Sequence, residues 1–361
     1  MKQIGLPLYF RYVAKHYFKN LIAVLFGLAF AFAAIDYFQH LRHLDTSGNQ
    51  KILYIYYMWQ EALGLLYPLA IVFALIMTKL SFVKQGVMGA LHAFGYTKKR
   101  LVLPFLGVAT LTYLVFIGLH TTSFSYAKDK AKALLEHQVD AYNVNDLFFK
   151  YNDTFVYMKK LDPIEKRLED ITIFKVTDKR VRYTIHAPYA TFDHKAWQAH
   201  DAILKTHIYE NEQLKRYKVE YKPTITTLRG YKPKIMESLY EGKALSLLDA
   251  YQAWKLIEAQ HLDSNKVRAS LYGKSIMPLF SLALLIILFF KMPYHERMMR
   301  QGIVIALSLG VTFVIWGLLF GLHQIGANGV LLPEVATILP VLLLWLYAIY
   351  IYMTDEKRIR T

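Results

Sequence analysis

The chain has 361 residues, with 43 Lys and Arg against 27 Asp and Glu, and it contains no cysteine. A mean hydropathy of +0.24 and a formal net charge of +16 can coexist only if apolar and charged residues occupy different parts of the chain, as they do here. The lack of cysteine excludes a disulfide scaffold, thiolate metal ligands and a cysteine nucleophile. The abundance of aromatic residues excludes a disordered or collagen-like chain. The composition is that of a membrane protein.

Six apolar stretches are long enough to cross a bilayer as helices, which takes about twenty residues. They are residues 20–39, 54–78, 101–123, 275–290, 302–325 and 331–353. The fourth reaches the required length when Leu271 and Tyr272 before it are included. The first exceeds the apolar part of a signal peptide, and no small-residue cleavage site follows it, so we predict a transmembrane span there too.

Lys and Arg are concentrated in alternate short connections, which predicts the orientation because the cytoplasmic side of a membrane protein carries this excess. On the richer side are Lys2, Arg11, Lys15, Lys19, Lys79, Lys84, Lys98, Lys99, Arg100, Lys291, Arg297, Arg300, Lys357, Arg358 and Arg360. The short connections of the other side contain only Arg42, Lys51 and Lys274. We therefore expect both termini in the cytoplasm and the long insert between the third and fourth spans outside it.

That insert, residues 125–270, is large enough to be a separate domain. It begins with a predicted helix over residues 126–138. After Val144, β-branched and aromatic residues recur in the runs 155–158, 171–176, 181–185 and 217–221, several of which alternate with polar residues as half-buried strands do. We predict an antiparallel sandwich or an open, jelly-roll-like sheet. Residues 245–261 then form an amphipathic helix that either lies on the membrane surface or packs under the β-domain.

The expected fold is therefore membrane α-helical, with six transmembrane helices, plus an extracytoplasmic all-β, jelly-roll-like domain inserted between helices three and four. The expected divisions are residues 1–124 for the first three helices, 125–270 for the β-domain with its flanking helices, and 271–361 for the last three helices. Polar residues within the spans, Glu334 among them, lie towards the outer ends and are interpreted as interfacial.

Motifs for catalysis are missing from the sequence. Gly273-Lys274-Ser275 is the last triplet of a phosphate-binding loop, but Arg268 stands where that motif needs its first glycine. Neither H-E-x-x-H nor G-x-S-x-G occurs. His40 and His43 flank Arg42 at the outer end of the first span and are interpreted as interfacial residues, with a metal-binding pair as the alternative. We expect no catalytic residue, no metal and no bound cofactor in this chain.

The connection between the second and third spans, residues 81–96, resembles a short helix that ends at Gly95 in the C′ position. Val87, Leu91 and Phe94 share one face at helical spacing. Two interpretations stay open. In a chain without an ATP site, such a helix can dock into a groove of a separate motor subunit, or it can be a simple interfacial loop.

Several motifs in their order resemble the LptF/LptG family, the permease subunits of the bacterial lipopolysaccharide export ABC transporter. Residues 90–97 match the second half of the family pattern E-L-x-A-L-x-A-x-G-x-[ST], and Pro68 and Pro104 fall where the family has prolines. Runs 168–174, 185–190 and 197–201 are similar to successive family strands, and 332–340 to its C-terminal half. Residues 11–12 and 35–37 look more like LptG. Val87 departs from the pattern, because the family has an acidic residue there.

The resemblance implies a non-catalytic half of a heterodimer with an LptF-like paralogue in the bacterial inner membrane, with the β-domain in the periplasm. An LptB-like ATPase dimer would use the ATP, and LptC- and LptA-like periplasmic proteins would accept the lipopolysaccharide. The lipid would enter sideways between spans one and five of opposite subunits and pass along the concave interior of the β-domain. No nucleic acid partner is expected.

The predicted site residues form three groups. The ATPase-coupling residues are Lys84, Val87, Leu91, His92, Phe94 and Tyr96. An outer basic cluster of His40, Arg42, His43 and Lys274 is expected to bind phosphate groups of the substrate, or else ordinary anionic headgroups. The acyl chains are expected on Phe155, Tyr157, Ile173, Tyr183 and Ile185, or else these side chains are simply core.

Two other functions fit the same sequence. One is a permease for another lipid or a lipoprotein, with the same docking helix and a different cargo. The other is a membrane-anchored receptor or scaffold whose external β-domain binds a protein or cell-wall partner. Co-purification separates these classes, because a transporter of this kind brings down an ATPase and a scaffold does not.

Overall fold

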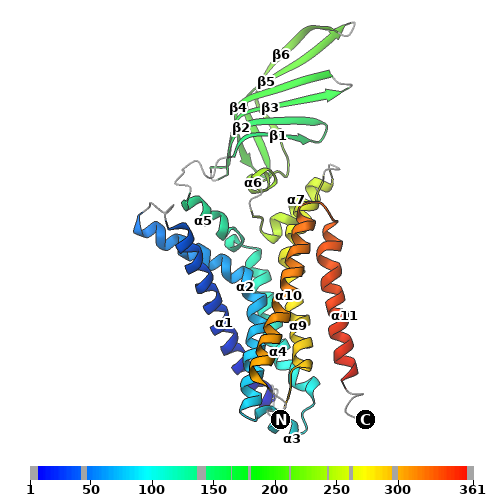
Figure 1. Ribbon diagram of the computed structural model, residues 1–361. Coiled ribbons are helices and arrows are strands. Elements are labelled where there is room, and N and C mark those ends of the chain that lie inside the picture. Colours follow the sequence, from blue (N-terminus) through cyan, green and yellow to red (C-terminus); the bar gives the residue numbers. More distant parts are fainter. Residues whose placement is uncertain are drawn as a thin grey trace, which may run out of the picture. The chain divides into compact units, whose positions relative to one another are not determined.

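The computed structural model describes residues 7–41, 47–135, 144–163, 165–177, 180–210, 213–241, 244–259, 263–294 and 300–355. The chain divides into two compact units (Figure 1). One unit comprises Met1–Lys128 together with Arg268–Thr361, and the other is Asp129–Val267. The first is helical and the second contains the β-sheet, as the sequence predicts.

Within the described residues, six helical segments are long and apolar enough to cross a membrane. They are α1 (Leu8–His40), α2 (Gly48–Lys84), α4 (Lys98–His120), the segment Asn265–Lys291, α10 (Gln301–Ala327) and the segment Glu334–Thr354. The fourth span consists of α8 (Asn265–Ser275), a 3-10 turn η3 (Met277–Leu279) and α9 (Phe280–Lys291). The sixth begins with the π-helical turn η5 (Glu334–Ile338) and continues as α11 (Leu339–Thr354).

Burial along the helices separates a central pair from a peripheral set. In α9 every residue from Phe280 to Phe290 is buried, and α2 is buried along most of its second half. In α1, a buried stripe repeats every four residues, which leaves the opposite face of the helix uncovered. The stripe consists of Val13, Tyr17, Leu21, Leu25, Ala29 and Ala33. α10 and α11 likewise have apolar faces that no other part of the described chain covers.

Short elements connect the two units and complete the β-domain. They are η1 (Ser123–Tyr126), α5 (Ala127–Leu135), α6 (Pro233–Glu241) and α7 (Leu247–Glu258). α7 corresponds to the expected amphipathic helix and buries Leu247, Ala250, Ala253 and Ile257. α6 is not apparent from the sequence pattern.

The β-domain is one six-stranded antiparallel sheet with its strands in chain order, so β1 and β6 are the edges. The strands are β1 (Val144–Tyr151), β2 (Thr154–Asp162), β3 (Arg167–Thr177), β4 (Arg180–Asp193), β5 (Ala196–Glu210) and β6 (Gln213–Thr227). Of the two expected forms, it is the open sheet. The buried side chains on one face of the sheet form the hydrophobic core of the β-domain. In this core, Trp197 donates a 2.7 Å hydrogen bond to the Tyr231 carbonyl.

In each central strand, β2 to β5, the alternation of buried and exposed residues is interrupted once. The four interruptions lie next to one another and form one row across the sheet. Within each half of a strand, buried residues are two apart, but across the row they are three apart. The pairs are Met158/Leu161, Leu168/Ile171, Ala187/Ala190 and Ala199/Ala202. At this row, Asp146, Asp170 and Asp201 have φ angles of +54°, +53° and +53°. The left-handed conformation resets the pleat, so both halves of the sheet bury the same face.

The residues opposite these aspartates fit the same interruption. By register, Lys159 stands opposite Asp146, Pro188 opposite Asp170, and Pro223 opposite Asp201. Proline has no N–H for the ladder and is tolerated where pairing is interrupted. Aspartate is one of the few non-glycine residues that occupy the left-handed region without large cost. We call this row the crease.

We predict that the crease requires a residue that tolerates positive φ. Asp201→Val should destabilise the β-domain by about 1–2 kcal/mol, because a β-branched residue is disfavoured in the left-handed region. Asp201→Asn is the matched control, because asparagine tolerates this conformation and retains an oxygen that can accept the bond from the Tyr221 hydroxyl. The measurement is thermal unfolding of the β-domain, monitored by its resistance to limited proteolysis. Equal resistance of the two variants would contradict the prediction.

Candidate functional site

A short helix, α3 (Val87–Ala93), connects α2 to α4. It starts after Gly86, whose φ of +72° turns the chain out of α2. At its end, the Gly95 N–H donates to the His92 carbonyl at 2.9 Å and the Tyr96 N–H donates to the Leu91 carbonyl at 3.2 Å. With a φ of +83° at Gly95, these two bonds form a Schellman motif. The helix therefore ends where Gly95 was expected to end it, but it starts later than residue 81 because α2 continues to Lys84.

The residues expected to contact an ATPase have two different environments. Val87, Leu91 and Tyr96 are half-buried and pack against the core of the helical unit. Lys84 and Phe94 are exposed, and Phe94 is 79% exposed. Val87 and Leu91 do not share an outward face with Phe94, because α3 ends at Ala93 and Phe94 belongs to the cap. Phe94 is therefore the large apolar side chain that this segment exposes.

Two of the predicted coupling residues, Tyr96 and His92, also make aromatic contacts. The Tyr96 ring lies 4.2 Å from the ring of Tyr9 in α1, and the His92 ring lies 5.2 Å from Tyr294, which follows α9. Val87 occupies the first position of α3, and the first turn has no acidic residue. At the position where the family has an acidic residue, this chain thus has Val87, which packs against the core of the helical unit.

A buried lysine fixes the end of α9 next to this segment. Lys79 of α2 is fully buried and donates to the carbonyl oxygens of Phe289 and Met292, the latter at 2.9 Å. Its ammonium group also lies 4.1 Å from the ring centroid of Tyr294. The last carbonyls of a helix have no intrahelical partner and carry partial negative charge, so a cation is the favourable donor for them.

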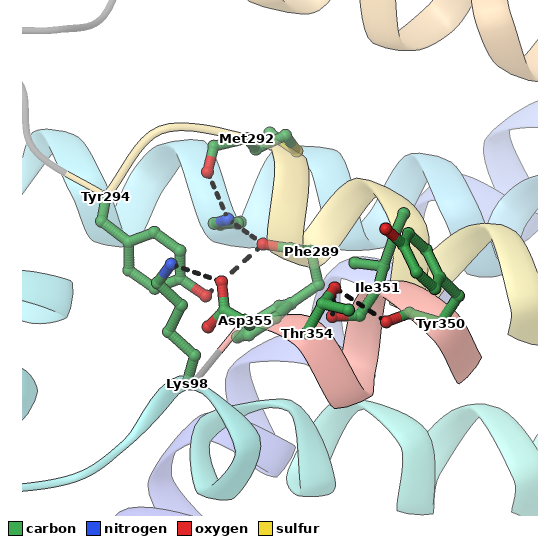
Figure 2. A network of polar contacts seen from close by, with 9 residues as sticks. Lys98, Phe289, Met292, Tyr294, Tyr350, Ile351, Thr354 and Asp355 are labelled. Atoms are coloured by element: carbon green, nitrogen blue, oxygen red, sulfur yellow. Dashed lines mark hydrogen bonds and ion pairs between the residues drawn. The ribbon is translucent and has the colours of Figure 1, made fainter. Parts of the chain in front are cut away.

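An ion pair closes the same region (Figure 2). Lys98 at the start of α4 contacts Asp355 at the end of α11, with an Nζ–Oδ1 distance of 2.9 Å and both side chains largely buried. The Lys98 ammonium lies 5.0 Å from the Tyr294 ring centroid. Burial raises the pKa of the Tyr294 hydroxyl, so the ring stays neutral between the two lysines. We call Lys79, Lys98, Phe289, Tyr294 and Asp355 the Tyr294 hub. It joins α2, α4, α9 and α11, and the His92 ring of α3 contacts its Tyr294 ring.

Sequence reasoning missed this role of Lys79, which was counted as a basic residue of the connecting loop. A local signal does exist, because Leu80, Phe82 and Val83 continue the apolar pattern beyond the lysine and are buried. The carbonyl partners are more than 200 residues away in the chain, and no local pattern indicates them.

The predicted outer basic cluster is only partly described. Arg42 and His43 lie outside the described residues. His40 contacts Asp36 one turn earlier in α1, with an Nδ1–Oδ2 distance of 3.4 Å, and Tyr54 of α2 donates to the same carboxylate. Lys274 is on α8, within electrostatic range of His120 at the end of α4. Binding of substrate phosphate by this cluster stays a prediction.

A second polar cluster joins the fourth, fifth and sixth spans. Arg268 contacts Glu334 with an Nη1–Oε1 distance of 2.6 Å, and the Tyr272 hydroxyl donates to the same oxygen at 2.9 Å. His323 of α10 lies 3.2 Å from the Thr337 hydroxyl in η5. Gly273 makes room for this histidine, since a Cβ there would lie 2.6 Å from its Cε1. Glu334 thus has a specific partner in another span in addition to its place near the helix end.

The five predicted acyl-chain residues lie on different surfaces of the β-domain. Phe155 and Tyr157 alternate with the buried Val156 and Met158, so they are on the face opposite the core. Ile173 is part of the core, and Ile185 packs against it. Tyr183 and Phe155 line one cavity at the ends of the strands. The hydrogen bond to Asp146 raises the pKa of Tyr157.

A comparison with protein families identifies the chain. The family model described as lipopolysaccharide export system permease LptF/LptG matches residues 11–354, which is nearly the whole length. The chain belongs to the LptF/LptG family. A search of curated proteins finds no match.

Membership in the LptF/LptG family makes this chain a permease component of lipopolysaccharide export, which acts together with other Lpt proteins. The match extends through both helical halves and the inserted β-domain. α3 and the cavity lined by Phe155 and Tyr183 therefore lie within the matched residues, as do all members of the Tyr294 hub except Asp355.

We predict that Lys79 stabilises this LptF/LptG chain by satisfying the end of α9. Lys79→Met retains most of the side-chain volume but leaves the Phe289 and Met292 carbonyls without this donor, which should cost about 1–3 kcal/mol for each group left unsatisfied. Lys84→Met, on the exposed last position of the same helix, is the control. Thermal unfolding in detergent measures the effect. Equal melting temperatures for the two variants would show that Lys79 has no such role.

Proposed function

We propose that this chain is the LptG-type half of a heterodimeric permease that extracts lipopolysaccharide from the inner membrane and passes it to a periplasmic bridge. The observation that carries the proposal is the continuous family match across an architecture of three spans, a β-domain and three spans. The resemblance of residues 11–12 and 35–37 favours LptG over LptF.

The uncovered helix faces support pairing with an LptF-like subunit. In α1, the exposed side chains Phe18, Ile22, Phe26 and Phe30 repeat every four residues beside the buried stripe. α10 exposes most of its apolar residues. These two helices are the expected sides of the lipid entrance, each facing the other subunit across the membrane. Their apolar surface suits either acyl chains or the partner's helices.

An LptB-like ATPase dimer supplies the energy in this proposal, and the chain itself is not catalytic. Phe94 is the exposed anchor for the ATPase, and Lys84, at the other end of the connection, is a second exposed residue. Because Val87 replaces the family's acidic residue and packs inwards, the contact here relies on the apolar Phe94. Movement of α3 then reaches four spans through His92 and the Tyr294 hub.

The distribution of basic residues supports the proposed orientation, with both termini in the cytoplasm and the β-domain in the periplasm. The lipid then leaves the outer leaflet of the inner membrane, contacts the β-domain, and continues to LptC- and LptA-like proteins. Phe155, Tyr157 and Tyr183 are the predicted lipid contacts that lie outside the core of the sheet, since Ile173 is only 4% exposed and Ile185 packs against that core.

The docking role of Phe94 leads to a direct test. Phe94→Asp should reduce the amount of co-purifying ATPase by about tenfold, because burying an unpaired carboxylate in an apolar groove is unfavourable. Phe94→Leu is the matched control and should retain the ATPase. Leu91→Asp is unsuitable, because Leu91 packs inside the permease and its loss would affect folding. Full ATPase recovery with Phe94→Asp would exclude this contact.

Transport through the β-domain leads to a second test. A photo-crosslinking residue at Tyr183 should capture lipopolysaccharide only when ATP is supplied to the assembled transporter, because transport must lift the lipid out of the membrane. The control position is Tyr217, which is exposed on the edge strand β6. Capture of a protein at Tyr183, or of lipid without ATP, would instead favour a receptor function.

A further inference from the structure

An open cavity of about 680 Å³ lies at one end of the β-sheet. The β1–β2 turn and the adjoining ends of β3 and β4 form it. The chain enters the sheet at the start of β1 and leaves it at the end of β6, and register places both points at the opposite end. The cavity is therefore at the end of the sheet that is remote from both of its chain connections.

Cations dominate the polar lining of this cavity. Lys150, Lys175 and Arg182 contribute three positive charges, against one carboxylate from Asp153. Asp153 is 84% exposed, and its oxygen lies 4.0 Å from the Lys175 ammonium, so this ion pair is weak. Among the described residues, Lys150 and Arg182 have no ion-pair partner. The cavity therefore has a net positive charge available to a ligand.

The backbone places Arg182 in this lining. Lys175 pairs with Tyr183, but the next residue, Val176, pairs with Val181. Arg182 is thus the extra residue of a β-bulge and has no cross-strand partner on β3. Bulges re-aim a side chain and are frequent next to binding sites. The bulge thus adds Arg182 to the lining of the cavity, together with Lys150 and Lys175.

The apolar part of the lining is aromatic. Phe155 and Tyr183 line the cavity, and Phe155 is held in a stack with Phe148 and Phe174, with centroid distances of 5.9 Å. An aromatic wall presents a flat apolar face suited to the faces of sugar rings, and arginine and lysine bind phosphate through charge-assisted hydrogen bonds. The combination matches a phosphorylated sugar better than an acyl chain.

We propose that this cavity is a subsite for the phosphorylated sugar headgroup of a glycolipid. The proposal rests on the proposed function, since the glycolipid is the exported substrate. Lys150 and Arg182 bind the phosphate, Lys175 adds charge, and Phe155 and Tyr183 contact the sugar. A headgroup held there keeps the lipid oriented at the end of the sheet from which a further protein can take it.

The absence of cysteine makes a local measurement simple. Thr177→Cys places the chain's single thiol in the cavity lining for an environment-sensitive fluorophore, and Thr224→Cys on the exposed part of β6 is the control label. The full-length protein in detergent is titrated with three probes: a bisphosphorylated glucosamine-disaccharide lipid, the same lipid without phosphates, and inorganic phosphate. A label in the cavity reports this subsite and not lipid bound elsewhere.

The expected result is half-saturation by the bisphosphorylated lipid at a concentration at least about tenfold lower than by the dephosphorylated lipid. The double variant Lys150→Glu/Arg182→Glu should abolish this difference. Lys222→Glu, which removes an exposed cation of β6, should retain it. Lys150→Gln/Arg182→Gln, which adds no negative charge, gives a second test if the first variant folds poorly, and it should also abolish the difference.

Equal responses to the two lipids in the unaltered chain would overturn the proposal, as would an unchanged preference in both double variants. Inorganic phosphate that acts at the same concentration as the phosphorylated lipid would overturn the assignment to a lipid headgroup. The measurement needs neither ATP nor a partner protein. If the label shows no preference for the phosphorylated lipid but Tyr183 captures lipid when ATP is supplied, the subsite is refuted and the export function stands. If the label shows the preference but Tyr183 captures no lipid with ATP, export is refuted and the subsite stands.

Discussion

The helical unit depends on how the backbone carbonyls at the end of α9 are satisfied. Hydrocarbon offers no hydrogen-bond donor, and α9 is surrounded by protein along its whole length, so its last carbonyls need a donor from the chain itself. Lys79 provides it from α2. A buried ammonium group is costly unless it is paired, and the two carbonyls with the Tyr294 ring provide that pairing. The central helices α2 and α9 are therefore joined at one point.

This junction also connects the central helices to the segment that would receive force from a motor protein. His92 of α3 contacts Tyr294, and the Lys98–Asp355 pair brings the ends of α4 and α11 to the same ring. α3 is therefore connected through the Tyr294 ring to several spans. At another membrane level, Glu334 with Arg268 and Tyr272 joins the fourth span to the sixth. Within the described part of the chain, the exposed apolar face of the peripheral helix α1 makes no comparable polar contact.

In the β-domain, one sheet forms its own core and, in the function proposed above, also presents a binding surface. At the crease, residues with positive φ reset the alternation, and both halves of every central strand bury the same face. The opposite face is then free to carry Phe155 and its aromatic stack. At the strand ends, a bulge adds Arg182 to this surface. Two kinds of backbone irregularity thus shape the sheet: one keeps its core on a single face, and the other adds a cation to the proposed headgroup cavity.

The sequence by itself determined the elements whose signal is local. Apolar length predicts the six spans, period-two alternation predicts four of the strands, and Gly95 predicts the end of α3, since each depends on the conformation of neighbouring residues. The tertiary structure alone decided which side chains are accessible: Phe94 is exposed and Leu91 is packed, although helical spacing places them on one face. It also decided the partners of Lys79 and the lining of the cavity. Those contacts join residues far apart in the chain, and their energies arise only when helices pack and strands pair in one register.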